Sequence, residues 1–179
     1  MRNDNKLIWE AFLNESPFGY HTLPSMFERE MSEMNVDNIK SKIFVDRFEN
    51  MDIYQDDDVY YILVDNEIAA YYRFKDEGKY LKTKLTWNSK KHKGTLRKFL
   101  GEYLLPKRGI IESDDAFSND AFTMWQKMVV EYPNYEFYAK FTDGRMSKRM
   151  TNYHEPLLYR EPMFKGDGNS TFVMKYGTK

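Results

Sequence analysis

Three strand-like segments in a row constrain the fold of this chain most. Residues 59–64 and 68–74 are rich in Val, Ile, Tyr and Phe, and the polar residues 65–67 between them are typical of a hairpin turn. From Tyr80 to Trp87, polar and apolar residues alternate, which predicts a third antiparallel strand with one apolar face. These segments have to pair with one another in a sheet.

The order of the next segments predicts a parallel pair of strands. A polar, basic loop at 88–94 leads into a helix that should end at Pro106, and residues 109–111 begin a short, buried strand. The third strand and this short strand should pair in parallel through a right-handed helical crossover. We therefore expect a mixed α/β fold, with a mostly antiparallel sheet, a central parallel strand pair and flanking helices.

The second half of this core continues with a helix and a strand. Ser118 is expected to cap a helix that stops at 132–134, and strand character returns at 135–141. Residues 142–170 are polar and rich in Gly, Arg and Pro, and 171–176 resemble a last strand. The long polar segment is either a functional lid or a surface excursion. In the second case its packing residues would be Tyr153, Leu157, Leu158, Tyr159 and Phe164.

The segments before residue 59 favour helices. An apolar repeat at 7–13, which Asn5 would cap, predicts a first helix. The apolar series at 36–48, which follows the cap residue Asn35, fits a second helix, although residues 42–48 also fit a strand. We expect helices within 5–50, a core at about 59–140, and a C-terminal loop and strand at 142–176.

Composition limits the classes of protein that fit this chain. Its 179 residues, of which 41% are hydrophobic and 17% aromatic, indicate one folded domain over 1–179. The formal net charge of -1 gives no global attraction to nucleic acid or to an anionic membrane. Because Cys is absent and no long apolar run follows the first residues, we expect a cytoplasmic protein without disulfides or a membrane span.

The basic loop resembles a cofactor loop. Residues 87–100, WNSKKHKGTLRKFL, place Trp87 at the end of a strand and one glycine before a helix. The segment resembles the acetyl-CoA loop of the GCN5-related N-acetyltransferase (GNAT) family, Q/R-x-x-G-x-G/A, here read as Lys91-x-x-Gly94-x-Leu96. Leu96 departs from the small residue of the family, and its side chain is expected either to crowd the phosphates of the cofactor or to force a different approach.

This resemblance implies a set of cofactor-binding residues. The amides of Gly94, Thr95 and Leu96 are expected to face the pyrophosphate of acetyl-CoA, and Lys91 or Lys93 would add positive charge. Trp87 and Ser118 complete the set at the ends of the neighbouring strand and helix. The basic patch also fits a nucleic-acid backbone or a solvated helix start, and it consists of Lys90, Lys91, Lys93, Arg97 and Lys98. Few aromatic side chains accompany the patch, which counts against the nucleic-acid alternative.

A second motif lies in the later helix. The pattern Ser118-x-x-Ala121-x-x-Met124-Trp125-Gln126-Lys127-Met128 resembles the family's N-x-x-A-x-x-L-Y-x-K-L helix, whose tyrosine serves as a general acid. Trp125 replaces that tyrosine. An indole N–H donates a hydrogen bond but releases no proton near neutral pH, so the acid role is weakened.

The resemblance also implies the chemistry. Family members transfer an acetyl group from acetyl-CoA to an amine acceptor, a small molecule or a protein. Glu112 at the end of the short strand is the first candidate for the base, with Asp114 behind it, although both also fit a solvated turn. Residues 110–114 resemble a strand end seen in acetyltransferase-like proteins of bacteriophages.

A different class of function stays open beside the enzyme. The departures at Leu96 and Trp125 fit a catalytically degenerate GNAT-like binding module, which on this alternative would be phage-encoded and have a host protein as its partner. His21, His92 and His154 lack metal-ligand spacing. No nucleophile triad, P-loop or dinucleotide fingerprint supports a hydrolase, kinase or dehydrogenase.

Overall fold

The computed structural model describes residues 34–114, 119–159 and 171–177. The chain divides into two compact units, Met1–Ser41 and Lys42–Lys179. The expected helix at 7–13, the cap residue Ser118 and Phe164 lie outside the described residues. The expectation of one domain over the whole chain stays a prediction.

The described part of the first unit is one short helix. Helix α3 (Val36–Lys40) is capped by Asn35, whose Oδ1 accepts a hydrogen bond from the Asn38 amide at 2.8 Å. The predicted helix over 36–48 is therefore wrong beyond Lys40, and the strand alternative for its second part is confirmed. Tertiary pairing decided the difference, because this apolar series fits both periods and the partner strand lies later in the chain.

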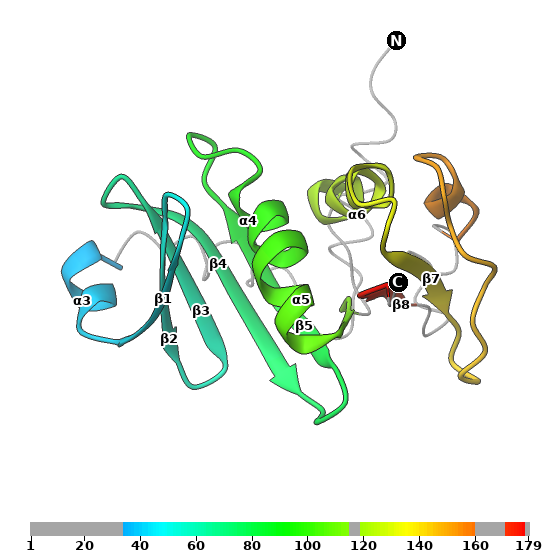
Figure 1. The fold of residues 1–179 in the computed structure, drawn as a ribbon, viewed down its shortest axis with the longest axis horizontal. Coiled ribbons are helices and arrows are strands. Elements are labelled where there is room, and N and C mark those ends of the chain that lie inside the picture. The colour runs from blue at the N-terminus through cyan, green and yellow to red at the C-terminus, as the bar shows by residue number, and fades with distance from the viewer. Residues whose placement is uncertain (1–33, 115–118, 160–170, 178–179) are drawn as a thin grey trace, which may run out of the picture. The chain divides into compact units, whose positions relative to one another are not determined.

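The second unit contains an eight-stranded sheet (Figure 1). The order of strands is β1-β2-β3-β4-β5-β6-β8-β7, and all neighbours are antiparallel except the pair β5 and β6. This confirms the mixed, mostly antiparallel fold class with one parallel pair. The strands are β1 (Ile43–Phe48), β2 (Met51–Asp56), β3 (Val59–Val64), β4 (Glu67–Asp76), β5 (Leu81–Asn88), β6 (Ile110–Glu112), β7 (Glu136–Lys140) and β8 (Thr171–Lys175).

The first five strands form a meander of hairpins. Asp65 and Asn66 connect β3 to β4 with φ values of 52° and 60°, which two-residue hairpin turns require and which Asp and Asn tolerate. The predicted strands at 59–64, 68–74 and 80–87 are confirmed. Sequence reasoning missed β2, although the buried residues Met51 and Ile53 show its two-residue period.

The parallel pair is short. Leu81 pairs with Ile111 and Lys82 with Glu112, so β6 lies beside the beginning of β5. The predicted parallel neighbours are confirmed. On its other side, β6 pairs with the last strand, β8, which lies between β6 and β7.

One continuous helix connects the two parallel strands and runs alongside β4 and β5 (Figure 1). It consists of α4 (Thr95–Lys98), a π-helical segment η1 (Phe99–Leu104) and α5 (Leu105–Arg108). The predicted end at Pro106 is wrong, because the helix continues through the proline to Arg108. The helix ends instead at Gly109, whose φ is 78°.

Two tyrosines, Tyr132 and Tyr135, contact the π-helical segment at Gly101. The Leu105 amide donates to the Leu100 carbonyl, a step of five residues, and the same step would pair the Gly101 carbonyl with Pro106, which has no N–H. The hydroxyl of Tyr135 donates to the Gly101 carbonyl at 2.9 Å instead. The Tyr132 ring stacks on Tyr135 and lies so close that a Cβ at Gly101 would be 2.4 Å from Tyr132 Cζ. Only glycine fits this contact.

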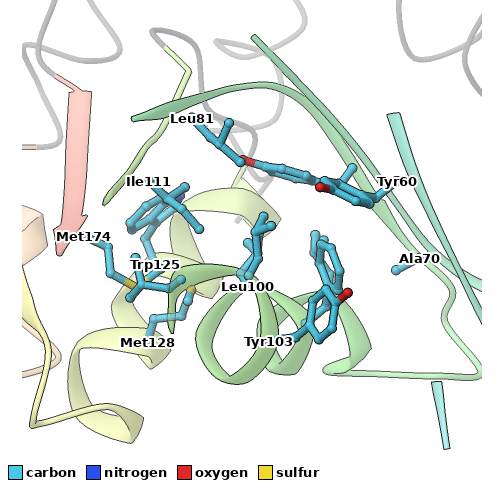
Figure 2. Packing of buried hydrophobic residues seen from close by; sticks show 14 of the residues in the cluster. Tyr60, Ala70, Leu81, Leu100, Tyr103, Ile111, Trp125, Met128 and Met174 are labelled. Atoms are coloured by element: carbon cyan, nitrogen blue, oxygen red, sulfur yellow. The ribbon is translucent and has the colours of Figure 1, made fainter. Parts of the chain in front are cut away.

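The hydrophobic core joins this helix, helix α6 (Asn119–Glu131) and one face of the sheet. Figure 2 shows Leu100 between an aromatic group that includes Tyr60 and Tyr103 and a second group that includes Trp125 and Ile111. All five side chains are buried. In the described part of the chain, no helix is both long and apolar enough to cross a membrane.

The polar segment after β7 is partly attached to the core. Its described part forms two isolated bridges to β7, buries Met150 and contains the short helix η2 (Glu155–Tyr159). The packing predicted for Leu158 is wrong, because this side chain is 74% exposed, and Leu157 and Tyr153 are also exposed. Tyr159 does pack against the core.

The hydroxyl of Tyr135 should contribute measurably to stability. Tyr135→Phe leaves the Gly101 carbonyl without its partner, so we expect a loss of about 1 kcal/mol in the free energy of unfolding. Tyr138→Phe is the matched control, because its hydroxyl donates to the side chain of the half-buried Glu136 and not to a backbone carbonyl, and it should change stability by less than about 0.5 kcal/mol. Urea unfolding measures both, and equal effects would contradict this account.

Candidate functional site

The candidate site comprises the loop 88–94, the start of α4 and the neighbouring end of β5. These parts belong to the second unit. The loop follows β5 directly, and Gly94 precedes α4 with a φ of 87°. An L-residue would be strained there, so the backbone itself requires this glycine.

Asn88 holds the loop in place. Its Oδ1 accepts a hydrogen bond from the Leu96 amide at 2.8 Å, and its Nδ2 donates to the carbonyls of His92 and Ser89. The Thr95 amide donates to the His92 carbonyl at 3.3 Å. Two of the three amides expected at the cofactor pyrophosphate are therefore already engaged within the chain.

The basic side chains of the loop differ in their partners. Lys91 Nζ lies 2.6 Å from Glu67 Oε1, and His92 Nε2 lies 3.0 Å from Glu67 Oε2. The hydrogen bond from Lys91, followed by that from His92, lowers the pKa of Glu67. Lys93 is exposed and makes no ion pair among the described residues. Of the two predicted lysines, Lys93 is the one available to an anion.

A hollow of about 460 Å³ lies beside the start of α4. Most of its lining residues are polar or charged, and the full set is Asn50, Met51, Lys93, Gly94, Thr95, Arg97, Lys98, Glu102, Glu131 and Tyr132. Arg97 pairs with Glu131, and Lys98 pairs with Glu49. A Cβ at Gly94 would lie 3.4 Å from Arg97 Nη2, so the guanidinium covers the glycine.

Leu96 and Trp125 both lie in the core. Leu96 is 4% exposed and Trp125 is 3% exposed, and both belong to the hydrophobic cluster. The Leu96 side chain therefore does not line the loop. The Trp125 ring packs on Phe172 of β8, with 5.9 Å between the ring centroids.

The second feature of the site is the opening between β5 and β6. After Lys82, β5 continues for six residues, and in the described part of the chain none of them pairs with β6 or β8. Ser113 instead bonds with Phe172 of β8, through backbone and side chain. The two parallel strands thus part, and the basic loop begins where β5 ends.

Glu112 lies where the strands part. Its side chain is 7% exposed, its Oε2 lies 2.8 Å from Lys140 Nζ, and its Oε1 accepts a hydrogen bond from the Thr171 hydroxyl at 2.9 Å. Glu112 is therefore not a solvent-facing turn residue, since strands β6, β7 and β8 each supply one member of this cluster. Asp114 is half-buried behind it, and Trp87 is half-buried on β5.

The comparisons with known proteins add no relative. No family model, curated protein or solved structure matches the chain.

Sequence reasoning missed three residues of the site: Asn88, Lys140 and Thr171. Lys140 lies on a predicted strand, and the alternation of the strand places it on the face opposite Phe137 and Ala139. The sequence therefore could have predicted that Lys140 lies on the polar face. It could not have predicted the proximity of Lys140 to Glu112, because β8 inserts between β6 and β7.

Loss of the Asn88 side chain should loosen the loop. Asn88→Ala removes the acceptor of the Leu96 amide and two donors, so we expect a loss of about 1–2 kcal/mol in the free energy of unfolding. Asn88→Asp keeps the acceptor and should recover part of this loss. Hydrogen exchange at the Leu96 amide, read by NMR, should accelerate in Asn88→Ala but not in Asn88→Asp. Equal protection in the two variants would refute the assigned bond.

Proposed function

We propose that the chain is a GNAT-like N-acyltransferase that transfers an acetyl group from acetyl-CoA to an amine acceptor in the cytoplasm. The observation that carries the proposal is the parting of β5 from β6 after two residue pairs, with the basic loop and helix at the far end of β5. In the family that the sequence resembles, the cofactor lies between such strands.

The residues of the loop are suited to the phosphates of the cofactor. Lys93 supplies a cation without a competing ion pair among the described residues, and the hollow beside Thr95 supplies space. Arg97 and Lys98 would have to exchange Glu131 and Glu49 for phosphate oxygens. Bound acetyl-CoA would bring the acetyl group as a thioester.

Glu112 is the proposed base of the transfer. A carboxylate at the point where the strands part can accept the proton that an attacking amine releases. Trp125 supplies no proton from within the core, so the leaving thiolate would be protonated by solvent. Good positioning of the reactants can lower the activation barrier of such a reaction by about 7–11 kcal/mol. One general acid raises the rate by about 100-fold to 10,000-fold, which is a smaller effect. Loss of the acid therefore slows the reaction without abolishing it.

A binding module without catalysis is the second candidate. The hydrogen bonds that engage the Thr95 and Leu96 amides favour it, because a cofactor site normally leaves such amides free for phosphate. On this alternative the partner is a protein, and the resemblance to proteins of bacteriophages points to a host protein.

Binding of acetyl-CoA should raise the melting temperature, because a ligand of the native state stabilises it by mass action. Lys93→Glu should weaken this binding by about tenfold or more, since it replaces a phosphate contact with a repelling charge. Lys90→Glu is the matched control, because Lys90 is exposed in the same loop but does not line the hollow. A thermal-shift titration measures the affinity, and no shift at millimolar acetyl-CoA would favour the binding module.

Labelled acetyl-CoA separates the two candidates. Incubated with a panel of small amines, peptides and cell extract, the protein should transfer label to an acceptor, and Glu112→Gln should reduce the rate by about 100-fold or more. A pull-down from the same extract tests the alternative, the binding module. Stable capture of a macromolecule, without label transfer and without acetyl-CoA binding, would replace the enzyme by the binding module.

A further inference from the structure

The carboxylate of Glu112 already has an amine beside it. Lys140 Nζ lies 2.8 Å from Glu112 Oε2, and this oxygen is held on a side chain that is 7% exposed. The Thr171 hydroxyl occupies the other oxygen, so the ammonium group and the hydroxyl together engage both oxygens. The geometry pairs a nucleophile with the base that would deprotonate it.

Lys140 is also accessible from outside. Its side chain is 31% exposed, and its Nζ lies 5.2 Å from the centroid of the Tyr80 ring, next to the start of β5. Tyr80 and Glu112 therefore place the amine from two sides, at the position where β5 and β6 part. Lys82 is the other amine near this position, because it is in register with Glu112 across the parallel pair.

We propose that Lys140 is an acyl acceptor of this chain, modified at its own ε-amine by the acyl thioester that the site binds. The inference rests on the proposed function and names its acceptor as a lysine of the same chain. In the step, the ammonium proton passes to Glu112, and the amine attacks the thioester carbonyl. A C–N amide bond forms and the C–S bond breaks. The nitrogen gives its second surplus proton to solvent, and the thiolate of coenzyme A leaves and takes up a proton from solvent.

The modification would change the site. Acylation removes the charge of Lys140, so among the described residues Glu112 keeps the Thr171 hydroxyl as its one hydrogen-bond partner. A buried carboxylate that loses its cation destabilises the fold. The acylated protein, and the substitution Lys140→Gln that imitates it, should melt at a lower temperature than the unmodified chain. Lys140→Arg keeps the positive charge, so its melting temperature should be close to that of the unmodified protein.

Mass spectrometry of acylated peptides tests the proposal in two arms. In the first arm the wild-type protein is incubated with acetyl-CoA, and acetylation at Lys140 should exceed that at the exposed Lys90, which does not line the hollow, by about tenfold or more, as expected for a positioned base. In the second arm acetic anhydride is the donor, which needs no binding site. Glu112→Gln should reduce Lys140 acetylation by acetyl-CoA by about 100-fold but should not reduce its acetylation by the anhydride, because the amine is then released from its ion pair.

The possible failures are distinguishable. If acetyl-CoA raises the melting temperature but Lys140 is acetylated no faster than Lys90, this inference is overturned and the proposed function stands. Preferential acetylation of Lys82 would likewise overturn the assignment of the acceptor. If acetyl-CoA produces no thermal shift and no acetylation, both fail together. If Glu112→Gln does not fold, the comparison of Lys140, Lys82 and Lys90 in the wild type still decides the proposal.

Discussion

The sheet of the second unit depends on a contact of two residue pairs. Leu81 with Ile111 and Lys82 with Glu112 are the pairs that join the meander β1–β5 to the group formed by β6, β8 and β7. A longer parallel ladder would have closed the edge of β5, and a shorter one would have split the sheet. The contact therefore joins the two parts of the sheet, and beyond it no described strand pairs with the edge of β5 that leads to the basic loop.

The helix between the parallel strands explains why two residue pairs are enough to hold the two parts of the sheet together. Its buried residues pack against both halves of the sheet, and the close approach at Gly101 fixes it against the chain at the end of α6. Pro106 leaves a carbonyl of the π-helical turn without a backbone partner, and a tyrosine hydroxyl replaces that partner. Local irregularity and tertiary packing thus support each other, as they must where a buried polar group would otherwise be left unpaired.

Compensation of charge governs what the site can bind. The sequence places five cations within nine residues of the loop and helix, which read in isolation is a strong anion site. In the folded chain Lys91, Arg97 and Lys98 each face a glutamate from another element. An anionic ligand therefore gains less than the count of cations predicts, because it competes with carboxylates that are already in place.

The sequence by itself determined the hairpin, the third strand, the short strand and the helix between them, because alternation, turn residues and caps are local signals. It also placed Glu112 at a strand end. The tertiary structure alone decided that residues 43–48 form a strand, that the helix passes Pro106, and that Asn88 engages the Leu96 amide. It likewise decided that Lys140 meets Glu112, because β8 enters the sheet between strands that precede it in the chain. Lys140 and Glu112 are 28 residues apart in the sequence, and no local pattern encodes their contact.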